Sequence, residues 1–249
     1  SARASVIAEW SGALLGLYLT RGALRTYPGK VRRAALRLWH NWKPLLGVNR
    51  DIFIRSLLLQ SVFFAITLQG ARLGDATVAA NALLLNGLLL AAHALDGLAH
   101  AVEALCGHAI GARDREALRR SMVVACGWSL LASVAFALLF LFGGHLFVQM
   151  QTDIASVRET AFQYLPYLAV LPLIAVWSYL LDGLFIGATR AREMRNAMVI
   201  SVVIAFPVAW ALHGFGNHGL WISFLLFMVL RSATLGVYAW RMQRRDQWF

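Results

Sequence analysis

The chain has 249 residues, of which 59% are hydrophobic and only 14% are charged. So few charged side chains cannot cover a water-soluble globule of this size, which excludes a soluble domain as the starting point. The net charge of +11 would favour nucleic-acid binding if it lay on a polar surface, but Lys and Arg cluster between apolar stretches. The charge therefore indicates membrane topology, and no nucleic-acid partner is expected.

Seven apolar segments follow one another along the chain, and a bilayer crossing needs about 20 such residues. The sequence therefore predicts an all-α fold, a polytopic membrane helix bundle. The chain opens with Ser1 and no basic leader or cleavage site, so we expect a fragment of a longer protein. The segments cover residues 4–20, 52–70, 77–105, 122–148, 161–189, 197–213 and 219–240.

Most of the 23 Lys and Arg lie near the ends that follow the first, third, fifth and seventh segments. The positive-inside rule places these ends in the cytoplasm, which predicts a multi-pass protein of the cell inner membrane with a cytoplasmic C-terminus. The connection at residues 21–50 mixes basic residues with Trp39 and Trp42. This composition predicts an amphipathic helix on the inner leaflet, and an unstructured basic linker is the alternative.

Polar side chains form a stripe on the third segment. The five positions Asn86, His93, Asp96, His100 and Glu103 are three, four or seven residues apart, so one helical face carries them all. Such a face should line water or protein rather than lipid. The histidines can relay protons near neutral pH, and hydrogen-bonded packing is the alternative for each of them.

The fifth and seventh segments carry Asp182 and Arg231, both expensive at membrane depth, where a charge costs about 2.5–3.5 kcal/mol. Counted at 1.5 Å per residue from the cytoplasmic arginines, Glu103, Asp182 and Arg231 lie roughly 12 to 15 Å from the inner charged layer. We expect Arg231 to pair with Asp182 or Glu103, because an unpaired guanidinium would be strongly penalised. A static ion pair that fixes helix packing is the alternative to a functional one.

Catalytic and metal-binding signatures are absent from the sequence. Cys106 and Cys126 match no paired metal spacing, and no P-loop, His-Glu-x-x-His or Gly-x-Ser-x-Gly pattern occurs. We therefore predict a protein that is not an enzyme, with no catalytic residue, no metal site and no cofactor.

Three motifs resemble the DinF-like branch of the multidrug and toxic compound extrusion (MATE) transporters. Residues 181–190 read Leu-Asp-Gly-Leu-Phe-Ile-Gly-Ala-Thr-Arg, and Met-Arg-Asn follows at 194–196. Residues 96–99 read Asp-Gly-Leu-Ala, with Glu-Ala-Leu-Cys-Gly-His-Ala-Ile-Gly-Ala-Arg at 103–113. The last segment has Gly-Leu-Trp-Ile at 219–222, then Phe227 and Arg231. Together these motifs extend over nearly the whole chain.

The resemblance implies a twelve-helix protein of two six-helix lobes, of which this chain would hold the C-terminal part. Residues 1–20 would be the last helix of the N-terminal lobe, residues 21–50 the basic cytoplasmic connection, and residues 51–249 the C-terminal six-helix lobe. It also implies efflux of small-molecule drugs or amphipathic cations by rocking of the two lobes, driven by H⁺ or Na⁺. Partners would be these compounds, membrane lipids and the missing N-terminal lobe of the same protein.

Family resemblance does not identify the coupling residue, because in well-understood members it lies in the missing lobe. Asp96, Glu103, Asp182 and Arg231 are expected to line the cavity or to hold its packing, with Asn86, His93 and His100 as lesser candidates. Two other functions stay open. One is a flippase of lipid-linked saccharides from the same superfamily, and the other is a membrane enzyme that uses the His, Asp and Glu stripe.

Overall fold

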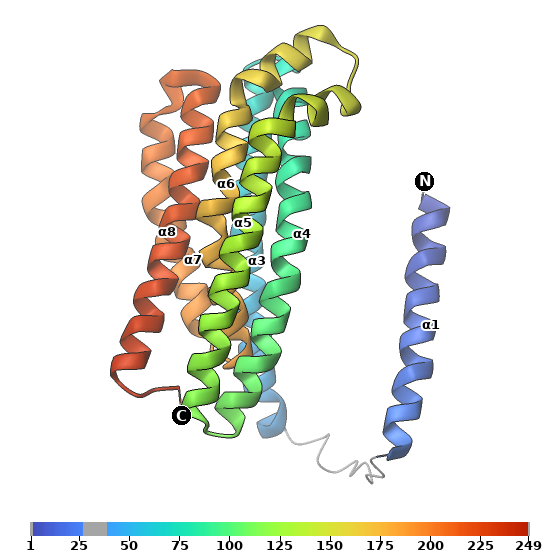
Figure 1. Ribbon diagram of the computed structural model, residues 1–249, viewed down its shortest axis with the longest axis vertical. Helices are drawn as coiled ribbons and strands as arrows, with labels where there is room; N and C mark the ends of the chain where they lie inside the picture. Colours follow the sequence, from blue (N-terminus) through green and yellow to red (C-terminus); the bar gives the residue numbers. More distant parts are fainter. Residues whose placement is uncertain (1, 27–38, 249) are drawn as a thin grey trace. The chain divides into compact units, whose positions relative to one another are not determined.

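The computed structural model describes residues 2–26 and 39–248 and divides into two compact units, Ser1–Leu45 and Leu46–Phe249. The first unit contains α1 (Ala2–Thr26). The second unit contains nearly all the remaining helices, which stand side by side along a common direction (Figure 1). We call this second unit the lobe.

Every regular element among the described residues is helical, which confirms the predicted all-α class. Within residues 2–26 and 39–248, six helices are long and apolar enough to cross a membrane, and α1 is not among these six. The helices that follow α1 are α3 (Trp39–Arg72), α4 (Asp75–Gly111), α5 (Arg115–Gln151), α6 (Ala155–Gly187), α7 (Ala191–Ala211), the short 3₁₀ helix η1 (His213–Phe215) and α8 (Gly216–Arg244).

Helices extend into both ends of the region predicted as a connection at residues 21–50. α1 runs to Thr26, and α3 begins at Trp39, so residues 39–50 are the first turns of a membrane-length helix. The prediction followed hydropathy, whereas a helix continues past the apolar core wherever its backbone hydrogen bonds can be completed. The amphipathic helix predicted for the connection at residues 21–50 falls in large part on residues 27–38, which lie outside the described residues.

The turns after α4 and α6 share one geometry. After α4, the amide of Asp114 donates to the carbonyl of Ala109 and that of Arg113 to Ile110, and Arg113 has φ 55°. After α6, Arg190 and Thr189 repeat this pattern, and Thr189 has φ 56°. This pair of bonds is the Schellman motif, which satisfies the last helical carbonyls and turns the chain sharply back.

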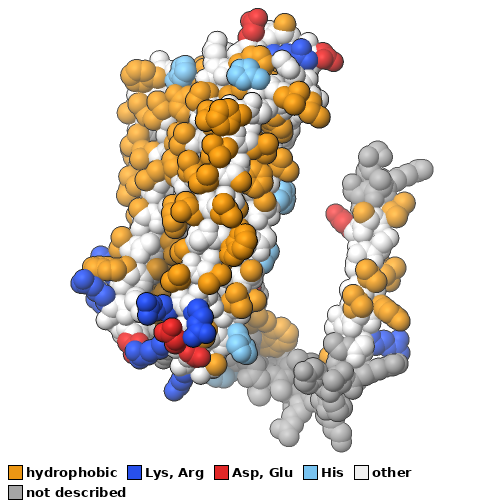
Figure 2. Space-filling view, in the orientation of Figure 1, with side chains coloured by type: hydrophobic (Ala, Val, Ile, Leu, Met, Phe, Trp, Pro, Cys, Tyr) orange, Lys and Arg blue, Asp and Glu red, His pale blue; other side chains and the backbone are white. Residues whose placement is uncertain are grey.

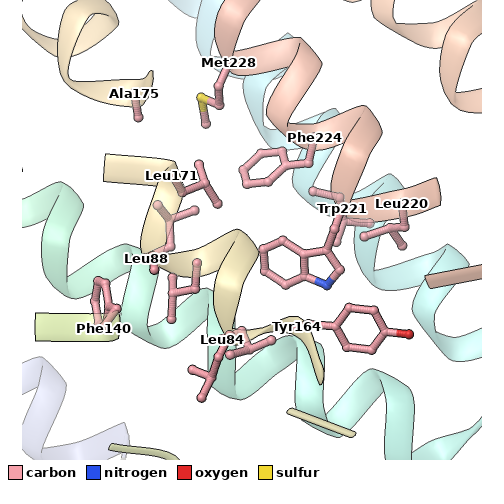
Figure 3. Packing of buried hydrophobic residues seen from close by; sticks show 14 of the residues in the cluster. Leu84, Leu88, Phe140, Tyr164, Leu171, Ala175, Leu220, Trp221, Phe224 and Met228 are labelled. Atoms are coloured by element: carbon pink, nitrogen blue, oxygen red, sulfur yellow. The ribbon is translucent and has the colours of Figure 1, made fainter. Parts of the chain in front are cut away.

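The core of the lobe surrounds α6, which lies against α4, α5 and α8. Its largest fully buried side chains include Trp221, Phe140 and Phe227. Figure 3 shows residues of α4, α6 and α8 interlocking around the indole of Trp221. α6 is buried on almost every side, because its sequence is apolar around the whole helix.

A small polar network lies inside this apolar core. The amide nitrogen of Asn81 donates to Asn217 at 2.7 Å, and the amide of Asn217 donates back at 3.0 Å. The indole nitrogen of Trp221 donates to the same Asn81 oxygen at 2.9 Å. All three residues are buried, so these bonds satisfy groups that would otherwise be costly, and they tie α4 to α8.

Glycines bring α4 and α6 into backbone contact. A Cβ added at Gly183 would lie 2.3 Å from the carbonyl oxygen of Ala99, and one added at Gly187 would lie 2.4 Å from that of Glu103. Real Cβ atoms do not approach other atoms so closely, so only glycine fits at these two positions. The contact fixes the height of Asp182, next to Gly183, relative to the polar stripe of α4.

Basic side chains gather at one end of the lobe. Figure 2 shows apolar side chains over the middle of the visible face and Lys and Arg concentrated at its lower end. The end of the chain lies there too, where Arg115 forms an ion pair with Asp246 and the Arg190 guanidinium donates to the carbonyl of Gln247 at 2.6 Å. This distribution is typical of helices that span a membrane with the basic end in the cytoplasm.

Candidate functional site: a buried ion triad beside a cavity

Three helices bring charged side chains together inside the lobe. Asp182 of α6 accepts a hydrogen bond from Nη2 of Arg231 in α8, and the same carboxylate oxygen accepts one from Nη1 of Arg55 in α3 at 2.9 Å. The side chain of Arg231 is 4% exposed, that of Asp182 11% and that of Arg55 17%. We call Arg55, Asp182 and Arg231 the ion triad.

Three buried polar atoms of the ion triad have no hydrogen-bond partner among the described residues. The second carboxylate oxygen of Asp182 and the Nε atoms of Arg55 and Arg231 are buried and have no hydrogen-bond partner. The guanidinium of Arg231 also lies over the ring of Tyr179, 5.7 Å from its centroid, where the negative face of the ring offsets part of the charge. Two cations share one anion, so the triad carries a net charge of +1.

A cavity of about 440 Å³ opens beside the triad, bounded by α3, α4, α6 and α8. Asp96 lines it, and this carboxylate has no ion pair or hydrogen bond among the residues that the structure describes. With the three triad residues, the lining holds two arginines and two carboxylates. The other lining residues include Gln60, Phe63, Asn86, Leu88, Tyr179 and Met228.

The structure separates the candidate residues into two groups. Asp96, Asn86, Asp182 and Arg231 line one cavity, and Arg231 pairs with Asp182 rather than with Glu103. Glu103 does not line the cavity. Its carboxylate contacts the ring of the exposed His100 at 3.3 Å, one turn back on α4.

Two further stripe residues have local partners. His93 is exposed, and its Nδ1 lies 2.7 Å from the carbonyl oxygen of Leu89 in the preceding turn. Asn86 donates to Gln151 of α5 at 3.5 Å, a long contact between exposed side chains. The stripe therefore lies on one helical face as expected, but only part of it reaches the triad.

Arg55 is a member of the site that was not among the candidates from the sequence. The sequence did hold a signal for it. Arg55 lies within the apolar run 52–59, and the next charged residue before it is Asp51. A charge inside an apolar run calls for a buried partner in the same way as Asp182 and Arg231 do.

A second ion pair joins α3 to α7. Asp51 is only 6% exposed and accepts a hydrogen bond from Nη1 of Arg195 at 2.7 Å. The neighbouring Arg50 also donates to it, at 3.1 Å. Together with the triad, this pair connects α3 to two other helices through charged groups.

No group of three or more His, Cys, Asp or Glu residues is placed to hold a metal ion within residues 2–26 and 39–248. On the α4 stripe, His93 contacts the carbonyl of Leu89, and His100 and Glu103 contact each other.

Comparison with known proteins agrees with this arrangement. The MatE family model matches residues 52–211, more than half of the chain. The chain belongs to the MatE family. It is 41% identical over its full length to DNA damage-inducible protein F of Escherichia coli K12, of which it covers 54%. It is 27% identical to the probable multidrug resistance protein NorM of Rhizobium meliloti, with 97% of this chain and 55% of that protein aligned.

Solved structures of MatE-like fold resemble the chain as well. A MOP superfamily transporter from Pyrococcus furiosus superposes with a TM-score of 0.70 at 21% identity, over 79% of this chain and 44% of that one. A multidrug resistance MATE family transporter in an outward-facing conformation gives a TM-score of 0.71 at 22% identity, over 83% and 46%. The likeness to these structures shows the shared helical fold. The chain spans about half the length of the relatives that it matches.

Proposed function

We propose that this chain is the C-terminal half of a cation-coupled multidrug efflux antiporter. Its MatE membership and the names of its relatives support transport of small molecules, including drugs and amphipathic cations. Six membrane-length helices with a basic end support a multi-pass protein of the inner membrane with a cytoplasmic C-terminus. The other half of the pathway would come from an N-terminal lobe, because the relatives are about twice as long.

The observation that carries the proposal is that one cavity is lined by two carboxylates, of which only Asp182 forms ion pairs among the described residues. Asp182 is held by two guanidinium groups, whose positive charges disfavour the binding of a further cation beside it. Asp96 lines the same cavity without an ion-pair partner among the described residues. A carboxylate that faces a polar cavity and lacks a partner is suited to bind and release H⁺ or Na⁺.

This arrangement assigns different roles to the two carboxylates. Asp96 would take up the coupling ion, and Asp182 would hold α3 and α8 together around the cavity. Binding a cation at Asp96 would change the net charge of the lining from zero to positive, because both arginines keep their charges. A cationic substrate would then be repelled, which is the exchange that an antiporter requires.

The test uses the complete reading frame that contains this chain. The protein is reconstituted in vesicles, and efflux of a cationic dye is measured under imposed H⁺ and Na⁺ gradients. Asp96→Asn should abolish gradient-driven efflux, because the amide cannot carry the ion. Glu103→Gln, seven residues away on the same helix but outside the cavity, should retain it.

Both variants must insert and remain folded for the comparison to count, which size-exclusion chromatography checks. Equal efflux by Asp96→Asn and the parent protein would remove Asp96 from coupling. No gradient-driven efflux of dyes by the parent protein would contradict the proposed function itself.

A further inference from the structure

A second, larger cavity lies on another side of α3, away from the ion triad. It is a groove of about 530 Å³ between α3, α7 and α8, lined mainly by apolar side chains that include Ile66, Ala205, Phe224 and Phe227. We call it the α3–α7 groove. Phe206 and Trp210 line it and are 67% and 78% exposed, so the groove opens at the surface rather than into the core.

The polar groups of this groove lie mostly at one end and include no acid. Arg72 is the last residue of α3, Gln69 precedes it by one turn, and His213 lies in the connection between α7 and α8. The side chains of Arg72 and Gln69 have no hydrogen-bond or ion-pair partner among the described residues. The two serines in the lining, Ser61 and Ser223, donate to carbonyls of their own helices and are already satisfied.

This combination matches one kind of ligand. An apolar slot along the helices would hold a hydrocarbon chain, and the guanidinium, imidazole and amide at its mouth would hold an anionic head. An amphipathic cation is disfavoured, because Arg72 would repel it and no carboxylate lines the groove.

The position of the groove indicates that this ligand comes from the lipid bilayer. Its polar mouth lies where α3 ends and α8 begins, at the end of the lobe opposite to the basic cluster, and the exposed Trp210 at the end of α7 also lines the groove. Tryptophan rings favour the level of lipid head groups, so the mouth lies at that level and the slot reaches into the acyl region. We infer that the α3–α7 groove binds an anionic phospholipid, with one acyl chain between α3 and α7 and the phosphate beside Arg72.

The test is native mass spectrometry of the purified chain with phosphatidylglycerol, phosphatidylcholine or oleate at equal concentrations. The parent chain should retain one phosphatidylglycerol in preference to phosphatidylcholine. Arg72→Gln should weaken phosphatidylglycerol binding about fivefold, the change that corresponds to about 1 kcal/mol for one basic residue near a lipid surface. The preference over phosphatidylcholine should largely disappear in this variant.

A matched pair of variants tests the slot itself. Ala209→Phe fills the groove and should abolish retention of both phospholipids, whereas Ala135→Phe adds the same ring to an exposed position of α5 and should leave retention unchanged. Arg72 is exposed at a helix end, so Arg72→Gln should fold even if Ala209→Phe does not. Lipid binding by Arg72→Gln then tests the inference without the filled groove.

Three outcomes would overturn the inference. Equal retention of phosphatidylglycerol by the parent and by all three variants would place the lipid elsewhere. Retention of oleate with the same dependence on Arg72, without retention of phospholipid, would identify a free fatty acid as the ligand. A doubled mass without bound lipid, lost in Ala209→Phe, would show that a second copy of the chain covers the groove.

Discussion

Removing the anion of the ion triad should cost far more stability than removing either cation. Asp182→Asn leaves the guanidinium groups of Arg55 and Arg231 buried near each other with no counter-charge. Breaking a buried pair in this way costs about 3–5 kcal/mol. The amide also cannot accept two charge-assisted hydrogen bonds with the strength of a carboxylate.

Arg231→Met has opposing effects that nearly cancel. The substitution loses a charge-assisted hydrogen bond to Asp182, worth about 1.5–3 kcal/mol, but it also removes a guanidinium whose burial costs several kcal/mol. Asp182 keeps Arg55 at 2.9 Å, so the remaining pair is neutral. We therefore expect the free energy of unfolding to fall by less than about 2 kcal/mol.

The assay is denaturant unfolding of the chain in mixed micelles, followed by tryptophan fluorescence. Arg192→Met is the control, because Arg192 is exposed at the start of α7 and forms no ion pair among the described residues. Equal losses for Asp182→Asn and Arg231→Met would refute the reasoning, since they would show that Arg55 does not compensate the carboxylate.

Three further predictions use the same unfolding assay. Gly183→Ala should lower the free energy of unfolding by at least about 1–3 kcal/mol through the clash with α4, whereas Gly97→Ala, with open space around its Cβ, should have no such effect. Asn217→Ala should cost about 1–3 kcal/mol, because it leaves a buried amide unpaired, and a cost below about 0.5 kcal/mol would contradict the network. Asp51→Asn and Arg195→Met should show a coupling energy of about 1–3 kcal/mol in a double-mutant cycle, and additive effects would mean that the pair is not formed.

The pairing of Arg231 with Asp182 could be predicted from sequence because membrane depth narrows the choices. A guanidinium in the middle of an apolar helix needs a partner, and few anions lie at the same depth. Counting residues from the basic ends gave that depth without any knowledge of the packing. Glu103 was an equal candidate, because counting fixes the height of a residue along its helix but not the direction in which the helix faces its neighbours.

Arg55 was not a candidate from the sequence, because hydropathy placed the start of its helix at residue 52 and Arg55 then lay at the helix edge. With α3 beginning at Trp39, Arg55 lies more than four turns inside the helix rather than at its edge. The cavity beside Asp96 and the groove beside Arg72 could not be predicted from one sequence either. Both depend on how three or four helices from distant parts of the chain pack around them.

Close approach of α4 and α6 at Gly183 and Gly187 has a mechanical consequence for the site. Where two helices touch through main-chain atoms, no side chain can rotate to absorb a displacement, so α4 and α6 move as one rigid unit. Asp96 lies in α4 and Asp182 in α6, so the two carboxylates move together. α3 contacts this rigid unit through the hydrogen bond from Arg55 to Asp182. Movement of α3 would therefore change the charge next to the two carboxylates.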